Sequence, residues 1–192
     1  MSTRTSARDR LLKAAAELFY AEGVGATGID TITARAGVAK MSLYNNFTSK
    51  ADLVDAYIKG RCEEWQDLYR QRSEQAHTPR ERILAVFDAY MDHAALAYDW
   101  GFRGCGLLNA AAELPVGHPG RVSVAGQKEE AEQLFREHLS GMNLTGTLSV
   151  DAMAEHLSFI LEGAMARAGL EGNDSRLRSA RALAASLLDQ LN

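Results

Sequence analysis

The stretch that decides the fold covers residues 26–53 and reads ATGIDTITARAGVAKMSLYNNFTSKADL. A capping-box pattern at residues 27–30 precedes apolar residues at helical spacing and Gly37, which predicts a short helix that ends at a glycine with positive φ. A second short helix is predicted from Lys40 to Phe47, with one apolar side and polar residues over the rest of its surface. Two short helices joined by a glycine-containing turn are the parts of a helix-turn-helix, although spacing alone fits a plain helical corner equally well.

The rest of the chain also shows apolar residues at helical spacing, and only three prolines interrupt its 192 residues. This pattern predicts an all-α fold, because the alternation typical of strands is scarce. Polar caps, glycines and prolines set the expected helix boundaries. The helices expected outside the quoted stretch span residues 6–22, 49–73, 78–98, 106–113, 121–139, 149–168 and 174–191.

Length and composition indicate one or two small domains in a reducing compartment. Apolar residues make up 46% of the chain, enough for a sizeable core. Two cysteines, Cys62 and Cys105, are too few for a disulfide framework or a cysteine-based zinc module, which favours the cytoplasm. The N-terminus is polar and no stretch reaches the roughly 18 uninterrupted apolar residues of a membrane span, so we expect a soluble, unprocessed protein without a membrane partner.

Charge is divided unevenly along the chain. The net charge is −4, but residues 1–50 hold seven basic and four acidic side chains, a net +3, which leaves −7 on residues 51–192. A basic front on an acidic body suggests a polyanion-binding head, or simply two differently solvated surfaces. Arg4, Arg8 and Arg10 either extend this head as a flexible arm toward phosphates or form a solvated tail.

The residue string itself resembles a known family. The pattern A-T-x2-D-x-I-x3-A-G-V-x4-L-Y-x2-F-x2-K-x2-L, from Ala26 to Leu53, is similar to the DNA-binding signature of TetR-family transcriptional repressors. The resemblance implies an N-terminal three-helix helix-turn-helix DNA-binding domain at residues 1–50, with a fourth helix from about residue 49 that links the domains. It further implies a helical ligand-binding and dimerisation domain at residues 51–192.

The resemblance implies DNA-contacting roles that side-chain chemistry supports. Thr27 and Tyr44 offer hydroxyls to backbone phosphates, and Lys50 combines its charge with the dipole at the start of the fourth helix. The exposed part of the third helix would face base edges, where a lysine can bind guanine and an asparagine can bind adenine. The residues expected there are Lys40, Met41, Ser42 and Asn45.

Three positions depart from the usual family pattern. Ala39 replaces a common serine at the start of the third helix, which removes a cap worth about 1 kcal/mol and one phosphate contact. Met41 stands where a small residue is frequent. Asn46 replaces a frequent histidine, and its amide can still hydrogen-bond a phosphate. These departures affect the details of the DNA contacts.

The last two helices resemble the family's dimerisation pair, which forms a four-helix bundle across a twofold axis. Their apolar stripes could instead pack inward on a monomer, but DNA readers of this kind need two heads for paired half-sites. We therefore expect a homodimer. The stripes expected to meet their symmetry mates are Leu157/Leu161/Ala164/Ala168 and Ala180/Ala184/Leu187/Leu191.

The middle of the chain is rich in amphipathic aromatic side chains, which can line an apolar pocket with a few polar handles. As a group they place an effector pocket, although aromatic residues at helical spacing are also ordinary core residues. The candidate ligand-binding residues are Trp65, Tyr69, Phe87, Tyr90, Met91, Phe102, Cys105, Asn109 and Phe135, with Tyr98 and Trp100 nearby in the sequence.

Cys105 lies at the start of an expected helix, two residues after Arg103. A helix N-terminus and a neighbouring cation both favour the reactive thiolate. The run F-R-G-C-x2-L-N-x3-E, from Phe102 to Glu113, also resembles a segment in a branch of the family that includes electrophile- and oxidant-responsive members. Cys105 is therefore either a switch or a buried inert thiol, whereas Cys62, in mid-helix, is expected to be structural.

Competing function classes have little support. The chain contains no HExxH, GxSxG or Walker glycine loop, and its five histidines never lie three or four residues apart, so no enzyme, metal or cofactor is expected. If the protein were an architectural DNA-binding protein, its aromatic-rich C-terminal part would have no function. The sequence predicts a cytoplasmic, dimeric repressor that a small apolar or aromatic molecule releases from a palindromic operator. The alternatives are a thiol-sensing repressor acting through Cys105 and, remotely, a small helical enzyme.

Overall fold

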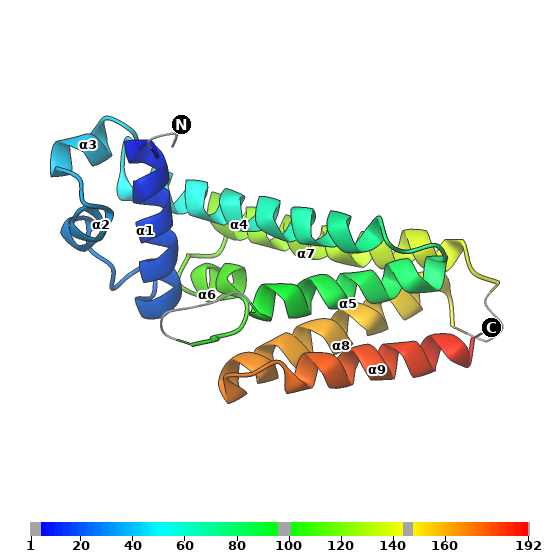
Figure 1. Ribbon diagram of the computed structural model, residues 1–192. Coiled ribbons are helices and arrows are strands. Elements are labelled where there is room, and N and C mark those ends of the chain that lie inside the picture. The colour runs from blue at the N-terminus through cyan, green and yellow to red at the C-terminus, as the bar shows by residue number, and fades with distance from the viewer. Residues whose placement is uncertain (1–4, 96–100, 144–147, 192) are drawn as a thin grey trace. The chain divides into compact units, whose positions relative to one another are not determined.

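The computed structural model describes residues 5–95, 101–143 and 148–191. Within those ranges every regular element is an α-helix, which confirms the all-α prediction (Figure 1). The helices are α1 (Ala7–Glu22), α2 (Ile29–Ala36), α3 (Lys40–Tyr44), α4 (Lys50–Ser73), α5 (Pro79–Ala95), α6 (Gly106–Ala112), α7 (Pro119–Ser140), α8 (Val150–Glu171) and α9 (Ser175–Asp189). Among the described helices, none is both long and apolar enough to cross a membrane. Arg4, Tyr98 and Trp100 lie outside the described residues.

Four of the predicted helix starts are confirmed by hydroxyl caps. In each, the side-chain oxygen accepts a hydrogen bond from the backbone N–H three residues later, with N···O distances of 3.1–3.2 Å. Such a bond satisfies one of the unpaired N–H groups at a helix N-terminus and contributes about 1 kcal/mol. The four caps are Ser6, Ser49, Thr78 and Ser149.

The helices pack into two compact units. Among the described residues, the first unit contains 5–62 and 106–124 and the second contains 63–95, 101–105 and 125–191, so α4 and α7 each contribute to both. In the first unit, α1 to α3 (blue to cyan in Figure 1) and the start of α4 enclose an apolar core. Its buried residues include Leu11, Phe19, Ile32, Leu43, Phe47 and Leu53. The three predicted helices of the head are thereby confirmed.

Helix α6 belongs to the first unit and is attached there at both of its ends. At its start, a Cβ on Gly106 would stand 2.9 Å from the Tyr57 hydroxyl, so glycine permits a close approach to α4. After its end, the Glu113 carboxylate accepts hydrogen bonds from the N–H groups of Val24 at 2.9 Å and Gly25 at 2.6 Å. The carboxylate therefore satisfies two backbone donors in the turn between α1 and α2.

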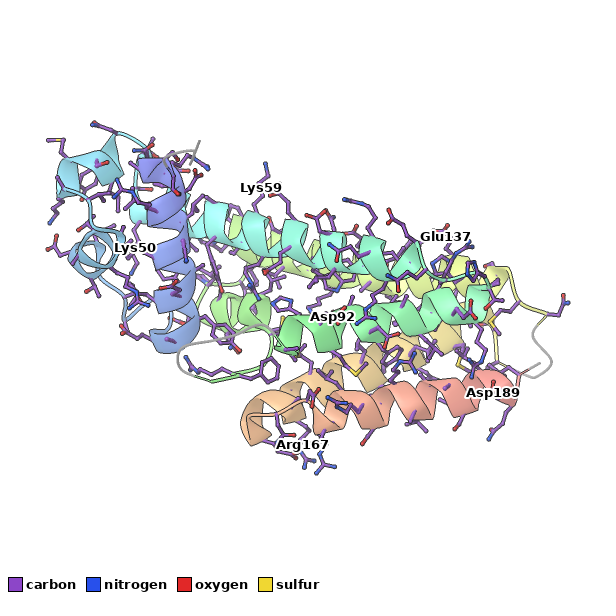
Figure 2. All side chains as sticks on the ribbon, in the orientation of Figure 1. Lys50, Lys59, Asp92, Glu137, Arg167 and Asp189 are labelled. Atoms are coloured by element: carbon purple, nitrogen blue, oxygen red, sulfur yellow. The ribbon has the colours of Figure 1, made fainter. Side chains whose placement is uncertain are left out.

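The second unit is a bundle of the C-terminal part of α4 with α5, α7, α8 and α9. Helices α8 and α9 lie side by side, and α9 also packs on α5 (Figure 1). Ion pairs join α5 to α9, since Arg181 lies 2.6 Å from Asp88 and Arg80 lies 2.7 Å from Asp189, which is labelled in Figure 2. These paired charges lie outside the apolar cluster of the second unit.

The stripes predicted to face a second subunit lie instead in the core of the second unit. Leu157, Leu161 and Ala168 of α8 are 0–1% exposed, and Ala184 of α9 is 0% exposed. They belong to one apolar cluster with residues of α5 and α7. The prediction is therefore wrong for these buried residues, because the chain's own helices already cover them. Ala164, Leu187 and Leu191 of the same stripes are only partly buried, and for them it stays a prediction.

Candidate nucleic-acid interface and ligand site

The turn between α2 and α3 is built on Gly37. Its backbone is left-handed, with φ 62° and ψ 40°, as predicted, and a side chain there would be strained. The Val38 N–H bonds the Thr33 carbonyl at 3.1 Å, and the Arg10 guanidinium donates to the Gly37 carbonyl at 3.2 Å. These bonds fix the direction in which the chain enters α3.

Helix α3 buries one side chain and exposes most of the others. Leu43 is 0% exposed, whereas Met41 is 69% exposed and Tyr44 is 49% exposed. Lys40 and Asn45 are also exposed. The structure therefore brings four of the predicted DNA-contacting side chains onto one short, solvent-facing element.

The end of α3 differs from the prediction. The helix spans Lys40–Tyr44 rather than reaching Phe47, although the Phe47 N–H still bonds the Leu43 carbonyl at 2.8 Å. Half-buried Asn46 donates from its amide to the Ser42 carbonyl at 2.7 Å, so both residues take part in ending the helix. At the other end, the N-cap Ala39 makes no side-chain bond, as expected for alanine.

Lys40 forms an ion pair across the turn. Its Nζ lies 2.7 Å from Oδ1 of Asp30, in the first turn of α2. The hydrogen bond and the charge of Asp30 raise the pKa of the Lys40 ammonium. Both side chains are well exposed, so the pair adds little to stability and another acceptor can replace the carboxylate.

Thr27 does not lie where the sequence placed it. Its side chain is 1% exposed, and its hydroxyl donates to the Gly23 carbonyl at 2.7 Å. The N-cap of α2 is Gly28, which makes no side-chain bond. The capping prediction for Thr27 is therefore wrong, and its hydroxyl is bonded within the protein rather than presented to a phosphate.

Lys50 begins α4 and is labelled in Figure 2. Its Nζ donates to the Gly25 carbonyl at 3.4 Å. An ammonium has three hydrogens, so this long bond leaves donors for a phosphate beside the positive end of the helix dipole. The position suits the phosphate-anchoring role that the sequence predicted, which stays a prediction.

Trp65 is the centre of the aromatic group in the second unit. The ring is 3% exposed, stacks on Tyr69 with centroids 5.9 Å apart, and meets Tyr90 edge-on at 6.2 Å. Trp65 and Tyr69 also line an open groove of about 590 Å³. The other residues of the groove are Gln66, Arg70, Ser73, Glu74, Arg82, Glu130 and Leu134.

Tyr69 also bonds a histidine of α7. Its hydroxyl lies 2.7 Å from Nε2 of His138. Burial raises the pKa of the Tyr69 phenol and lowers the pKa of the His138 imidazole. The pair is therefore a neutral, hydrogen-bonded contact between α4 and α7.

The other predicted ligand-binding residues lie in the core or outside the groove. Phe87 and Phe135 are 0% exposed, with ring centroids 5.6 Å apart, and form ordinary core. Met91 and Phe102 are partly buried against that core. Asn109 is half-buried in α6 of the first unit. A role of these residues in ligand binding stays a prediction.

A buried polar network surrounds Lys128 of α7. Two of its members, Tyr90 and Cys105, were predicted from the sequence, whereas Lys128 and Glu162 were not. The Lys128 Nζ lies 3.0 Å from the Tyr90 hydroxyl, 3.0 Å from Glu162 Oε1 and 3.5 Å from Cys105 Sγ. The Tyr90 hydroxyl in turn donates to Glu162 at 2.7 Å. The side chains of Lys128 and Glu162 are only 18% and 25% exposed. Cys105 thus lies beside a largely buried cation.

The electrostatics of this network keep Lys128 charged. Burial alone would lower the pKa of the ammonium, but Tyr90, Cys105 and Glu162 outweigh it and raise that pKa well above its ordinary value. Burial raises the pKa of the Tyr90 phenol, which stays protonated. One sequence signal could have revealed Lys128: it interrupts an apolar stripe of α7 formed with Val124, Ala131 and Phe135.

Across the described ranges, no three side chains of His, Cys, Asp or Glu converge as metal ligands would. The network around Lys128 instead offers hydrogen-bond donors, acceptors and a thiol. Its chemistry therefore suits recognition of a small molecule or modification of the thiol.

Known proteins are similar to this chain both in the helix-turn-helix and over most of its length. Residues 11–57 match the family described as "Bacterial regulatory proteins, tetR family". The transcriptional regulator AcuR of Cereibacter sphaeroides is 30% identical over 179 residues, which cover 90% of this chain and 81% of AcuR. The HTH-type transcriptional repressor KstR2 of Mycobacterium tuberculosis is 34% identical over 94 residues, 47% of each protein. The first curated relatives are matched over less than half of their length, and their names include an activator as well as repressors.

A solved structure matches the fold over nearly its whole length. SCO4454, a TetR-family transcriptional regulator from Streptomyces coelicolor, superposes with a TM-score of 0.85 at 30% sequence identity. The alignment covers 96% of this chain and 95% of that one. The similarity therefore includes α5 to α9 as well as the helix-turn-helix.

Proposed function

Because the chain belongs to the TetR family of bacterial transcriptional regulators, we propose that it is a dimeric DNA-binding repressor that a small effector releases from a palindromic operator. The exposed face of α3 carries this proposal. Buried Leu43 anchors the helix, and the left-handed turn at Gly37 sets its direction. A short helix held in this way fits the major groove of DNA.

In this proposal, some residues of α3 and the turn after it contact base edges and others contact the DNA backbone. Lys40, Met41, Ser42 and Asn45 face base edges in this proposal, with Lys40 exchanging Asp30 for guanine and Asn45 pairing with adenine. Phosphates are bound by Tyr44, Asn46 and Lys50. We leave Thr27 out, because its hydroxyl is already bonded to the Gly23 carbonyl.

The dimer surface is proposed on the outward sides of α8 and α9. Phe159 and Leu170 of α8 are 63% and 85% exposed, and Leu183 of α9 is 50% exposed. Large apolar side chains on two neighbouring helices favour a protein contact. Exposed Gly163 and Ala166 lie on the same side of α8 as Phe159 and would let a second copy approach closely.

The effector is proposed to act through the second unit, where Trp65 and Tyr69 line the groove. Release requires the effector to prefer the conformation with low DNA affinity, and a hundredfold loss of affinity corresponds to about 2.7 kcal/mol of coupling. Chain connectivity offers a route, since Cys105 directly precedes α6 and Glu113 after it bonds the α1–α2 turn.

A thiol sensor at Cys105 is the second candidate, and the Lys128 ammonium 3.5 Å from its sulfur favours it. Electrophiles and oxidants attack cysteine sulfur, and this sulfur accepts a hydrogen bond from a charged group. In either case we place the protein in the cytoplasm, without a cofactor and without catalytic activity.

The DNA-binding proposal is tested by gel shift with the protein's own promoter fragment. Tyr44→Phe and Lys50→Ala should weaken binding to all sequences and lower its salt dependence, while Asn45→Ala should relax preference at particular bases. Lys59→Ala is the matched control, because it removes an exposed lysine further along α4. The assignment is wrong if the three variants bind like the control. A reporter fused to that promoter separates repression from activation.

Two further measurements test the proposed dimer surface and the thiol sensor. Phe159→Asp should lower the mass by light scattering toward one chain, whereas Val116→Asp, at an apolar residue of the first unit that is 90% exposed, should leave it unchanged. N-ethylmaleimide should release DNA from wild type but not from Cys105→Ser if the thiol is the sensor. Equal release of DNA from both proteins would exclude the thiol of Cys105 as the sensor.

A further inference from the structure

The groove of the second unit contains an arginine that the fold leaves unpaired. Arg82 of α5 is half-buried and lines the groove. Its neighbours Arg70, Arg72 and Arg80 each pair with a carboxylate at 2.5–2.8 Å, whereas the Arg82 guanidinium has no ion pair or hydrogen bond within the described part of the chain. Charges that are partly removed from water are normally paired, so the groove favours an anionic occupant.

The Tyr69–His138 pair lies near Arg82 but does not neutralise it. Burial is the main cause of the raised pKa of the Tyr69 phenol and of the lowered pKa of the His138 imidazole, and the charge of Arg82 acts on both groups. The phenol is therefore protonated and the imidazole neutral near pH 7. Neither group supplies a negative charge to the guanidinium.

The two carboxylates that line the groove leave Arg82 available as well. Both oxygens of Glu130 accept hydrogen bonds from the Gln66 amide at 3.0 Å. Glu130 also precedes His138 by eight residues of α7, about 12 Å along the helix, so it lies toward the other end of the groove. Glu74 is exposed, where water and salt screen its charge. A cationic occupant would find only this screened carboxylate, whereas an anionic one finds a half-buried cation.

The same groove has an apolar wall. Trp65 and Tyr69 stack with ring centroids 5.9 Å apart and an interplanar angle of 9°, and half-buried Leu134 of α7 lines the groove with them. The volume of about 590 Å³ is ordinary for a small-molecule site. An aromatic or aliphatic body can pack on this wall while its polar end meets the guanidinium.

The geometry of a guanidinium selects among anionic groups. Its planar fork donates two parallel hydrogen bonds to a carboxylate, and this charge-assisted pair is stronger than a bond between neutral groups. A primary amide has the same shape but offers one acceptor oxygen and no charge. An ammonium offers no acceptor and is repelled.

We propose that the effector is an apolar or aromatic carboxylate whose body packs against Trp65, Tyr69 and Leu134 and whose carboxylate is bound by Arg82. The inference rests on the proposed function, since it names the chemical class of the effector. It adds a charged recognition residue that the aromatic residues alone do not provide.

The test is calorimetric binding to the full chain without DNA at pH 7.5. The probes are 4-propylbenzoate, 4-propylbenzamide and 4-propylbenzylamine, which share a propylphenyl body and carry an anionic, a neutral and a cationic end. Wild type should bind the benzoate at least tenfold more tightly than the other two, because only the benzoate forms a charge-assisted pair with Arg82.

Two arginine variants separate the role of Arg82 from the overall charge of the protein. Arg82→Gln should abolish the preference for the benzoate, and it should fold, because it breaks no ion pair within the described residues. Arg178→Gln is the matched control, since this arginine of α9 does not line the groove and pairs with Asp174. It should retain the preference.

A third variant tests the apolar wall. Leu134→Ala should weaken binding of the benzoate and the benzamide by the same factor, because it removes apolar contact area and no charge. The proposal is overturned by equal affinity for the benzoate and the benzamide, by tightest binding of the amine, by an unchanged preference in Arg82→Gln, by unaltered binding in Leu134→Ala, or by no binding of any probe.

This experiment can fail independently of the proposed function. If wild type shifts operator DNA but shows no preference for the benzoate, the regulator stands and the ligand class falls. If wild type prefers the benzoate but binds no operator, the site stands and the proposed repressor falls.

Discussion

Replacing Gly169 with alanine should destabilise the second unit, although alanine is the better helix former. Gly169 lies in α8, and a Cβ there would stand 2.7 Å from both Cα and N of Gly104 and 2.9 Å from the carbonyl carbon of Arg103. These are backbone atoms, so no side-chain rotation can relieve the clash. The segment before Cys105 must move away from α8.

The magnitude follows from two opposing contributions. Alanine in a helix interior gains about 0.5–1 kcal/mol over glycine, whereas an extra methyl group forced into a packed site costs about 1–3 kcal/mol. The net loss is about 1–2 kcal/mol. For a chain of this size that corresponds to a fall in Tm of about 2–8 °C.

The assay is thermal unfolding followed by circular dichroism at one protein concentration. Gly126→Ala is the matched control, since a Cβ at this exposed position of α7 meets nothing within 4 Å and should raise Tm by about 1–4 °C. Opposite shifts in the two variants support the close approach of Gly169 to Gly104. A rise in Tm for Gly169→Ala equal to that of the control would refute it.

Substitutions at three further positions test single contacts. Ala39→Ser should restore the missing cap of α3 and raise the stability of the first unit by about 1 kcal/mol, and an unchanged urea midpoint would contradict this. Glu113→Ala should lower Tm by about 2–6 °C, because two backbone N–H groups lose a charged acceptor; Glu113→Gln should recover part of the loss, and equal melting of all three proteins would count against the contact. The pKa of His138 is lowered by burial, so the unfolded state binds more protons below about pH 6.5 and stability should fall as the pH drops. Between pH 7.5 and 5.5, the Tm of His138→Gln should therefore fall less than the Tm of wild type. A larger fall in the variant would contradict this prediction.

The helix-turn-helix could be predicted because its signals act over a few residues. A hydroxyl cap such as Ser6 needs only the N–H three residues later, and Gly37 needs only its own freedom to adopt positive φ. Neither depends on the rest of the fold. The same locality explains why Thr78 and Ser149 were also placed correctly, and why the cap of the fourth helix was narrowed to Thr48 or Ser49, of which Ser49 makes the bond.

Thr27 shows where local signals become ambiguous. Its hydroxyl could cap α2 or bond the Gly23 carbonyl, and the sequence pattern suits both. The tight turn from Gly23 to Gly28 brings that carbonyl to 2.7 Å and buries the side chain, so the second option prevails. Backbone geometry outside the predicted helix made this choice.

The buried stripe of α8 was assigned to the dimer surface for a different reason. Helix α8 has apolar residues on two sides, one containing Leu157 and Leu161 and the other containing Phe159 and Leu170. Helical spacing identifies both sides but not which one faces the chain's own core. That depends on the packing of α5, α7 and α9, so the more regular stripe was assigned to the wrong contact.

The pairing of Lys128 with Glu162 could not be predicted from the sequence because the two residues are 34 positions apart on different helices. The apolar stripe around Lys128 marks the lysine but not its partner, and only the packing of α7 against α8 brings the two side chains to 3.0 Å. A buried ion pair of this kind seldom adds stability over an apolar pair of similar volume, because both ions lose their hydration. Packing therefore does not explain why the pair is there. In this pair the carboxylate keeps one oxygen unpaired within the described residues, and the ammonium lies beside Cys105.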